Sequence, residues 1–139
     1  MRRPRGDEGS VLVLVIGFAM VLTLMVGVVV DVSAAVLARR AVASAADGAA
    51  VAAAQALDLD RLYADGLRGE RLPLSPAGAR QRVAAYGGQV VGAQPGLRLA
   101  VTVDGSTATV VAARDVRLPF DRLLGRRPLR VQEIGRAHV

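Results

Sequence analysis

The chain has no cysteine, no tryptophan and no lysine, and it has one histidine among its 139 residues. The absence of cysteine excludes disulfides, zinc–thiolate sites, iron–sulfur clusters and thiol catalysis, and it leaves the redox compartment open. The single histidine, His138, excludes a histidine cluster. Aromatic residues make up only 3% of the chain. A nucleic-acid surface built on interleaved aromatic side chains is therefore not expected.

All 18 basic residues are arginine, and the formal net charge is +6. A basic balance is compatible with nucleic acid, with anionic lipid or with simple solubility. The charges are unevenly placed, because residues 11–30 carry none. This uncharged run decides which of the three interpretations applies.

Residues 11–30 read VLVLVIGFAMVLTLMVGVVV, in which 16 of 20 positions are Val, Leu, Ile, Phe or Met. At about 1.5 Å per residue, a helix of this length spans about 30 Å, the thickness of a bilayer hydrocarbon core. The Val, Leu, Ile and Phe residues together favour insertion by roughly 4–8 kcal/mol as an upper bound. The run predicts a transmembrane helix.

Two other interpretations of this run are considered. A buried core helix is one, but core runs are usually shorter and rarely free of polar residues. A cleaved signal peptide is the other, with Val32, Ser33 and Ala34 resembling a small-residue cleavage site. The apolar run is longer than the roughly 7–15 residues of the hydrophobic region of a signal peptide. We therefore expect an uncleaved signal anchor.

The orientation of the anchor follows from the flanking arginines. The N-terminal side has three (Arg2, Arg3 and Arg5), and the C-terminal side has two nearby (Arg39 and Arg40). The side with more arginines stays in the cytoplasm. Residues 1–10 are thus expected to form a cytoplasmic tail of a single-pass protein in the cell membrane, and the chain after the span is expected to be extracytoplasmic.

The helix is expected to continue beyond the membrane over residues 31–59, because alanine, the best helix former, fills 13 of the 23 positions from 34 to 56. Ala41, Ala45, Ala49 and Ala53 repeat every four residues and form a ridge of small side chains. Such ridges let helices approach closely, which favours a helix–helix or helix–sheet contact within an assembly. Chance spacing in an alanine-rich segment explains the ridge equally well.

The N-terminal half also resembles a known family. The resemblance is carried by an arginine-rich tail ending in Asp-Glu-Gly-Ser at 7–10, the apolar span, Leu-Ala-Arg-Arg at 37–40, and Ser-Ala-Ala-Asp-Gly-Ala-Ala-Val-Ala-Ala-Ala at 44–54. Together these segments resemble the TadE/TadG-like proteins of the bacterial tight-adherence (Flp) pilus-assembly machinery. The resemblance covers about residues 7–57 and implies a pilin-like, single-span protein. Its expected partners are membrane lipid and, through the ridge at Ala41, Ala45, Ala49 and Ala53, other pilin-like or pilus-assembly proteins.

One feature departs from the prepilins of that system, which have a glycine cleavage site followed by glutamate at the fifth mature position. The fifth residue after Gly9 is Leu14, and the fifth after Gly6 is Val11. The resemblance therefore favours the TadG-like, unprocessed branch.

Residues 60–139 are expected to form a small α+β head that docks against the alanine-rich helix, since a module of this size without disulfides has little core of its own. After a loop over 60–74, a helix is expected over 77–86, capped by Ser75 and Pro76 and ended by Gly87 and Gly88. A loop over 89–96 leads to a strand over 97–103, a turn at Asp104 and Gly105 and a return strand over 107–116. A helical turn over 120–124 and a third strand from Leu129 complete the head.

The sequence shows no motif for catalysis. It lacks a P-loop, a dinucleotide fingerprint, HExxH and an EF-hand loop. Asp58 and Asp60 are interpreted as surface charges and His138 as a solvated tail residue. The arginines at 126, 127 and 130 are interpreted as a solvated loop, with contact to an anionic cell surface or an acidic partner as the alternative. We predict no catalytic, cofactor-binding or metal site, no nucleic-acid partner and no small-molecule substrate.

The sequence thus favours a non-enzymatic, single-pass membrane component of a tight-adherence pilus system that acts as a structural or assembly subunit. The alternative is a secreted or surface-exposed binding module whose first 34 or so residues are a cleaved signal. The two differ in whether the apolar run remains on the mature protein.

The anchor hypothesis predicts that the mature, membrane-bound protein keeps its N-terminus. Intact-mass measurement of the protein extracted from membranes is expected to give the uncleaved chain. A mature chain that begins near residue 35 would establish the signal-peptide alternative instead.

Overall fold

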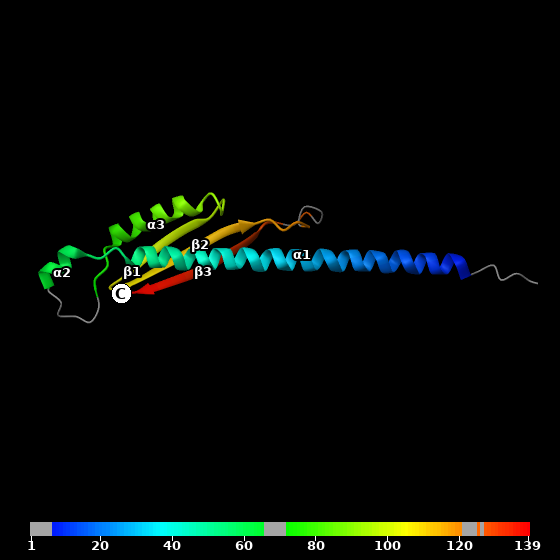
Figure 1. Cartoon of the computed structure of the whole chain (residues 1–139), viewed down its shortest axis with the longest axis horizontal. Helices are drawn as coiled ribbons and strands as arrows, with labels where there is room; N and C mark the ends of the chain where they lie inside the picture. The colour runs from blue at the N-terminus through cyan, green and yellow to red at the C-terminus, as the bar shows by residue number, and fades with distance from the viewer. Residues whose placement is uncertain (1–6, 66–71, 121–124, 126) are drawn as a thin grey trace, which may run out of the picture.

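The computed structural model describes residues 7–65, 72–120, 125 and 127–139. The elements follow the order α1 (Asp7–Ala54), α2 (Leu59–Asp65), α3 (Pro76–Val90), β1 (Arg98–Asp104), β2 (Thr107–Val116) and β3 (Leu129–His138). In Figure 1, α1 runs as one rod, and the remaining elements gather around its C-terminal part. The α+β class predicted from the sequence is confirmed.

Helix α1 is continuous for 48 residues because no proline interrupts it and alanine fills its second half. It ends at Ala54, five residues before the predicted end. Its last turn tightens as the amides of Gln55 and Ala56 bond to carbonyls three residues back, at 3.3 and 3.0 Å. Leu57 then pairs with Leu74 in an isolated bridge. This extended pairing stops the helix where local propensity alone would continue it.

The three strands form one antiparallel sheet in the order β1-β2-β3. Strand β2 has the predicted bounds, β1 is shifted by one residue, and β3 runs from the predicted Leu129 to His138. The hairpin between β1 and β2 turns at Gly105, whose φ of +57° is readily available to glycine. The predicted turn is confirmed.

Both long helices pack on the same side of the sheet. Helix α1 crosses β2 and β3, whereas α3 lies over β1. Alternate residues of β1 are half-buried and exposed, as expected for a strand with one covered face. The buried side of α1 follows helical spacing, with Ala38, Val42, Ala46, Ala49 and Ala53 between 0 and 7% exposed. The predicted docking of the head on the alanine-rich helix is confirmed.

Gly135 in β3 lets the backbones of helix and sheet come into contact. A side chain at this position would overlap the carbonyl group of Ala46 and the amide nitrogen of Asp47 in α1. Nearby, Arg39 of α1 forms an ion pair with Glu133 of β3 across the same contact. The sheet therefore packs on α1 with the two backbones in direct contact at Gly135. Larger residues on either side would prevent this close packing.

Helix α3 begins as predicted and ends later. The Ser75 hydroxyl accepts a hydrogen bond from the Gly78 amide at 3.2 Å, and Pro76 occupies the first helical position. The predicted stop at Gly87 and Gly88 is wrong, because the helix continues to Val90. Gly87 faces Leu99 of β1, so packing on the strand holds the helix through both glycines.

Two other predictions on the connecting segments have separate outcomes. The loop expected over 60–74 contains the short helix α2 in its first part, so that prediction is wrong there, while 66–71 lie outside the described residues. In the helical turn expected over 120–124, Phe120 is part of a turn and 121–124 lie outside the described residues.

The backbone contact at Gly135 predicts that Gly135→Ala destabilises the head by about 1–3 kcal/mol, because the added methyl group forces the sheet away from α1. Thermal unfolding of the full chain in detergent, followed by circular dichroism, measures this. Gly88→Ala is the matched control: its methyl group meets no atom within 4 Å, and alanine is favoured over glycine inside a helix. Equal effects of the two variants would contradict the proposed contact.

Candidate functional site

The N-terminal half of α1 leaves its apolar side chains uncovered. The Val, Leu, Ile, Phe and Met side chains of residues 11–30 are between 42 and 72% exposed. Burying one such side chain away from water is worth about 1.5–3 kcal/mol, so a surface of this size requires lipid or protein around it. Among the described residues, α1 is the one helix long and apolar enough to cross a membrane.

The exposure of this run removes the core-helix interpretation, since the chain does not bury it. The change from exposed to buried occurs at Ala38, the first residue of α1 whose side chain is enclosed by the head. Val32, Val36 and Leu37 remain exposed between the uncharged run and the head. The same helix therefore has a bare apolar half and a covered alanine-rich half, and these meet without a break.

The alanine ridge predicted from the sequence lies mostly inside the chain's own core. Ala45, Ala49 and Ala53 are at most 2% exposed, and Ala41 is half-buried. The Ala41 carbonyl also accepts a hydrogen bond from the Gln94 side chain at 3.2 Å. The ridge thus serves the contact with the sheet and α3, and it is not a free surface for a partner.

The connection that follows β2 reaches back along α1 to the end of the apolar run. The Phe120 ring lies against Gly27, where a Cβ atom would be 3.4 Å from the ring. The Phe120 amide donates a hydrogen bond to Oδ1 of Asp31 at 3.2 Å. Asp31 is half-buried and hydrogen-bonded within the chain.

Sequence reasoning did not identify Gly27 or Phe120 as a contact. They are 93 residues apart, and a glycine within an apolar span is common in membrane helices. No local pattern distinguishes a glycine that receives an aromatic ring from one that does not. Gly17, in the same run, has no neighbour within 4 Å of its Cβ position.

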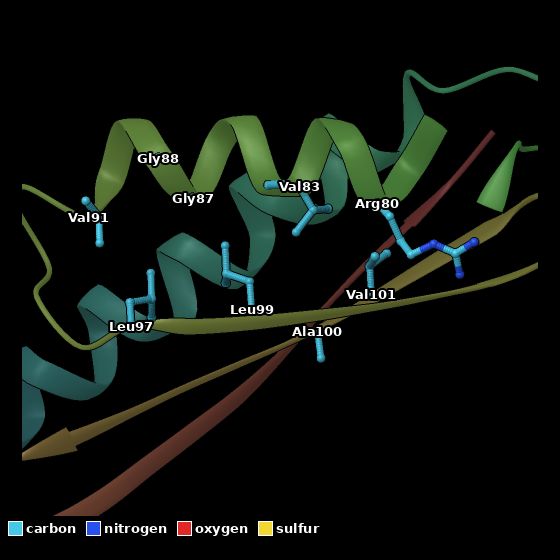
Figure 2. A pocket seen from close by; sticks show the side chains of 10 residues that line it. Arg80, Val83, Gly87, Gly88, Val91, Leu97, Leu99, Ala100 and Val101 are labelled. Carbon is cyan, nitrogen blue, oxygen red and sulfur yellow. The ribbon is translucent and has the colours of Figure 1, made fainter. Parts of the chain in front are cut away.

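An open apolar groove of about 550 Å³ lies between α3 and β1. Figure 2 shows Leu99 and Val101 pointing toward α3 and Val83 pointing back toward the strand. Arg80 is the one charged residue that lines the groove. The groove can receive an apolar side chain, but it offers few polar groups to orient a substrate.

The remaining residues singled out from the sequence lie apart from one another. His138 belongs to the last strand rather than to a tail, and its Nδ1 is 2.9 Å from the Thr107 hydroxyl on the exposed face of the sheet. Arg127 and Arg130 are exposed at the start of β3, and Arg126 lies outside the described residues. Within the described part of the chain, no three His, Asp or Glu residues gather to hold a metal ion.

The geometry defines a class: a helix with a bare, membrane-length apolar half that carries a small α+β head on its other half. Within this class, residues 9–56 match the Tad family model, which describes TadE/G-like proteins of Flp pilus assembly. The match covers nearly all of α1 and none of the sheet. Comparison with curated proteins and with solved structures gives no match.

The family match confirms the resemblance seen in the sequence. The chain carries a TadE/G-like N-terminal region, and with its long apolar helix it fits a component of Flp pilus assembly. The matched family is one of structure and assembly rather than of catalysis.

Proposed function

We propose that this chain is a non-enzymatic, single-pass membrane subunit of a tight-adherence pilus-assembly system, with a pilin-like structural or assembly role. The observation that carries the proposal is the continuity of α1. One helix holds both the bare apolar run and the segment on which the head is seated, and the TadE/G-like match lies on that same helix. The first half then acts as the anchor and the second as a rigid support.

The contact with partner subunits is assigned to the exposed apolar part of α1. The alanine ridge is covered by the head. The surface that remains for packing by neighbouring helices is therefore the apolar span. Gly17 gives that span a small-residue position where another helix can approach closely, since none of the described residues lies within 4 Å of its Cβ position.

The orientation places the N-terminus in the cytoplasm and the head outside. Arg2, Arg3 and Arg5 support this, because arginines close to the span in sequence set the orientation during insertion. The arginines that follow β2 lie far along the chain, and long segments are translocated largely regardless of charge. They therefore do not weigh against an extracytoplasmic head.

An unprocessed N-terminus agrees with the course of α1. The helix passes without interruption through Val32, Ser33 and Ala34, and the resemblance favours the TadG-like branch that is not cleaved. The anchor thus stays joined to the head, which a mechanical role requires.

Membrane integration is expected to depend on residues 11–30. Arginine in place of both Val21 and Val26 costs about 6 kcal/mol of insertion free energy, which is comparable to the whole favourable sum for the run. The double variant is expected to leave the membrane fraction after carbonate extraction. The control pair, Val51→Arg with Val91→Arg, replaces valines of similar exposure outside the uncharged run and is expected to stay membrane-bound. Identical behaviour of the two pairs would contradict the anchor.

The pilus role is tested in the cells that encode the chain. Disruption of the gene is expected to abolish or strongly reduce piliation, and the wild-type chain is expected to restore it. Of the two double variants above, only the one at Val51 and Val91 is expected to complement. Coimmunoprecipitation of the restored chain should recover pilus-assembly proteins, and normal piliation without the gene would refute the role.

A further inference from the structure

The connection between β2 and β3 brings an aromatic ring to the outer end of the apolar run. In Figure 1, the orange residues that follow β2 extend toward the N-terminal half of α1. Leu118 still packs against the core of the head. Two residues later, the Phe120 ring covers Gly27, the one buried residue within 11–30.

The depth of this contact follows from helix geometry. Gly27 precedes Val30, the last uncharged residue of the run, by three positions, which corresponds to about 5 Å along the axis. If residues 11–30 fill the hydrocarbon core, the Phe120 ring lies within about one helical turn of its outer boundary. Asp31 marks the first polar level above it, and it already accepts the hydrogen bond from the Phe120 amide. A phenylalanine ring is favourable in hydrocarbon, so at this level it can be transferred from water into the edge of the lipid core.

Positive charge flanks the ring on both sides in the chain. Residues 117–130 hold five arginines and one aspartate. In the described part, Arg117, Arg127 and Arg130 are exposed, and none has an ion-pair partner there. Asp115, opposite Arg130 in the sheet, is bound by Arg98 at 2.6 Å. The guanidinium groups are thus available to bind phosphate oxygens in two-point geometry.

We propose that Phe120 enters the lipid interface beside Gly27 as a second membrane contact, while Arg117, Arg127 and Arg130 bind phospholipid headgroups. This inference rests on the proposed membrane span. It commits to lipid rather than to a protein partner because the ring is placed at the membrane boundary by the chain's own anchor. The surrounding charge has the sign that headgroup phosphates attract.

The contact has a mechanical consequence. The head is held by α1 and, beside it, by the connection, so two points rather than one determine its tilt. A head fixed in this way presents its exposed sheet face in one orientation relative to the membrane.

Because the chain has no tryptophan, one substitution gives a unique fluorescent probe at the site. Phe120→Trp in the full chain is reconstituted into vesicles that contain phosphatidylglycerol and brominated phosphatidylcholine. Phe18→Trp, within the span, is the positive control, and Tyr63→Trp, at a side chain 84% exposed on α2, is the negative control. We expect brominated lipid to quench the probes at 18 and 120 and aqueous iodide to quench the probe at 63.

The outcomes separate this inference from the proposed function. If the probe at 18 is quenched by lipid and the probe at 120 is quenched only by iodide, the second contact is refuted and the anchor stands. Protection of the probe at 120 from both quenchers indicates a protein cover and also refutes lipid contact. Failure of lipid to quench the probe at 18 refutes the anchor and this inference together. If Phe120→Trp lowers the melting temperature, Pro119→Trp, at the exposed neighbouring position, carries the same readout.

The arginine part of the inference has its own test. Neutralising Arg127 and Arg130 to glutamine is expected to lower the ratio of docked to undocked connection by about fivefold per arginine in anionic vesicles, seen as reduced lipid quenching at position 120. Neutralising Arg80 and Arg136, exposed elsewhere on the head, removes the same charge and is expected to leave quenching unchanged. Equal loss in both pairs would show a general charge effect and overturn the specific contact.

Discussion

The close approach of α1 to the sheet is the constraint on which the head depends. Gly135 and the alanine face of α1 together remove the side-chain layer that normally separates a helix from a strand. Because the sheet is small and has few large apolar residues, its stability relies on this contact rather than on a core of its own. Two other positions follow: α3 covers β1 on the same face, and the residues after β2, as far as Phe120, extend along α1 to Gly27.

One helix has two surroundings, and its composition changes accordingly. Valine and leucine dominate where α1 is bare, and alanine dominates where the head encloses it. In the first half, the large side chains provide the free energy of transfer into lipid. In the second, small side chains permit contact at backbone distance. The contact between Phe120 and Gly27 lies at the junction, where the head meets the boundary of the run.

Predictions from the sequence were most accurate where the signal is local. The alternation in β1, the glycine turn at Gly105 and the Ser75 cap depend on a few neighbouring residues, and all three appear in the structure. They failed where distant segments compete with local propensity. The pairing of Leu57 with Leu74 ends α1 early, and packing on β1 extends α3 past its two glycines.

The sequence alone predicts the long helix, the membrane-length apolar run, the strands and the resemblance to the TadE/G-like family. Each of these depends on periodicity, composition or contiguous sequence. Only the tertiary structure determines which glycines and alanines lie in close contacts and which segment packs against each of them. The alanine ridge is covered by the chain's own sheet, Gly135 receives a helix backbone, and Gly27 receives Phe120. These contacts join segments dozens of residues apart. The sequence around a glycine or an alanine does not indicate which distant segment packs against it.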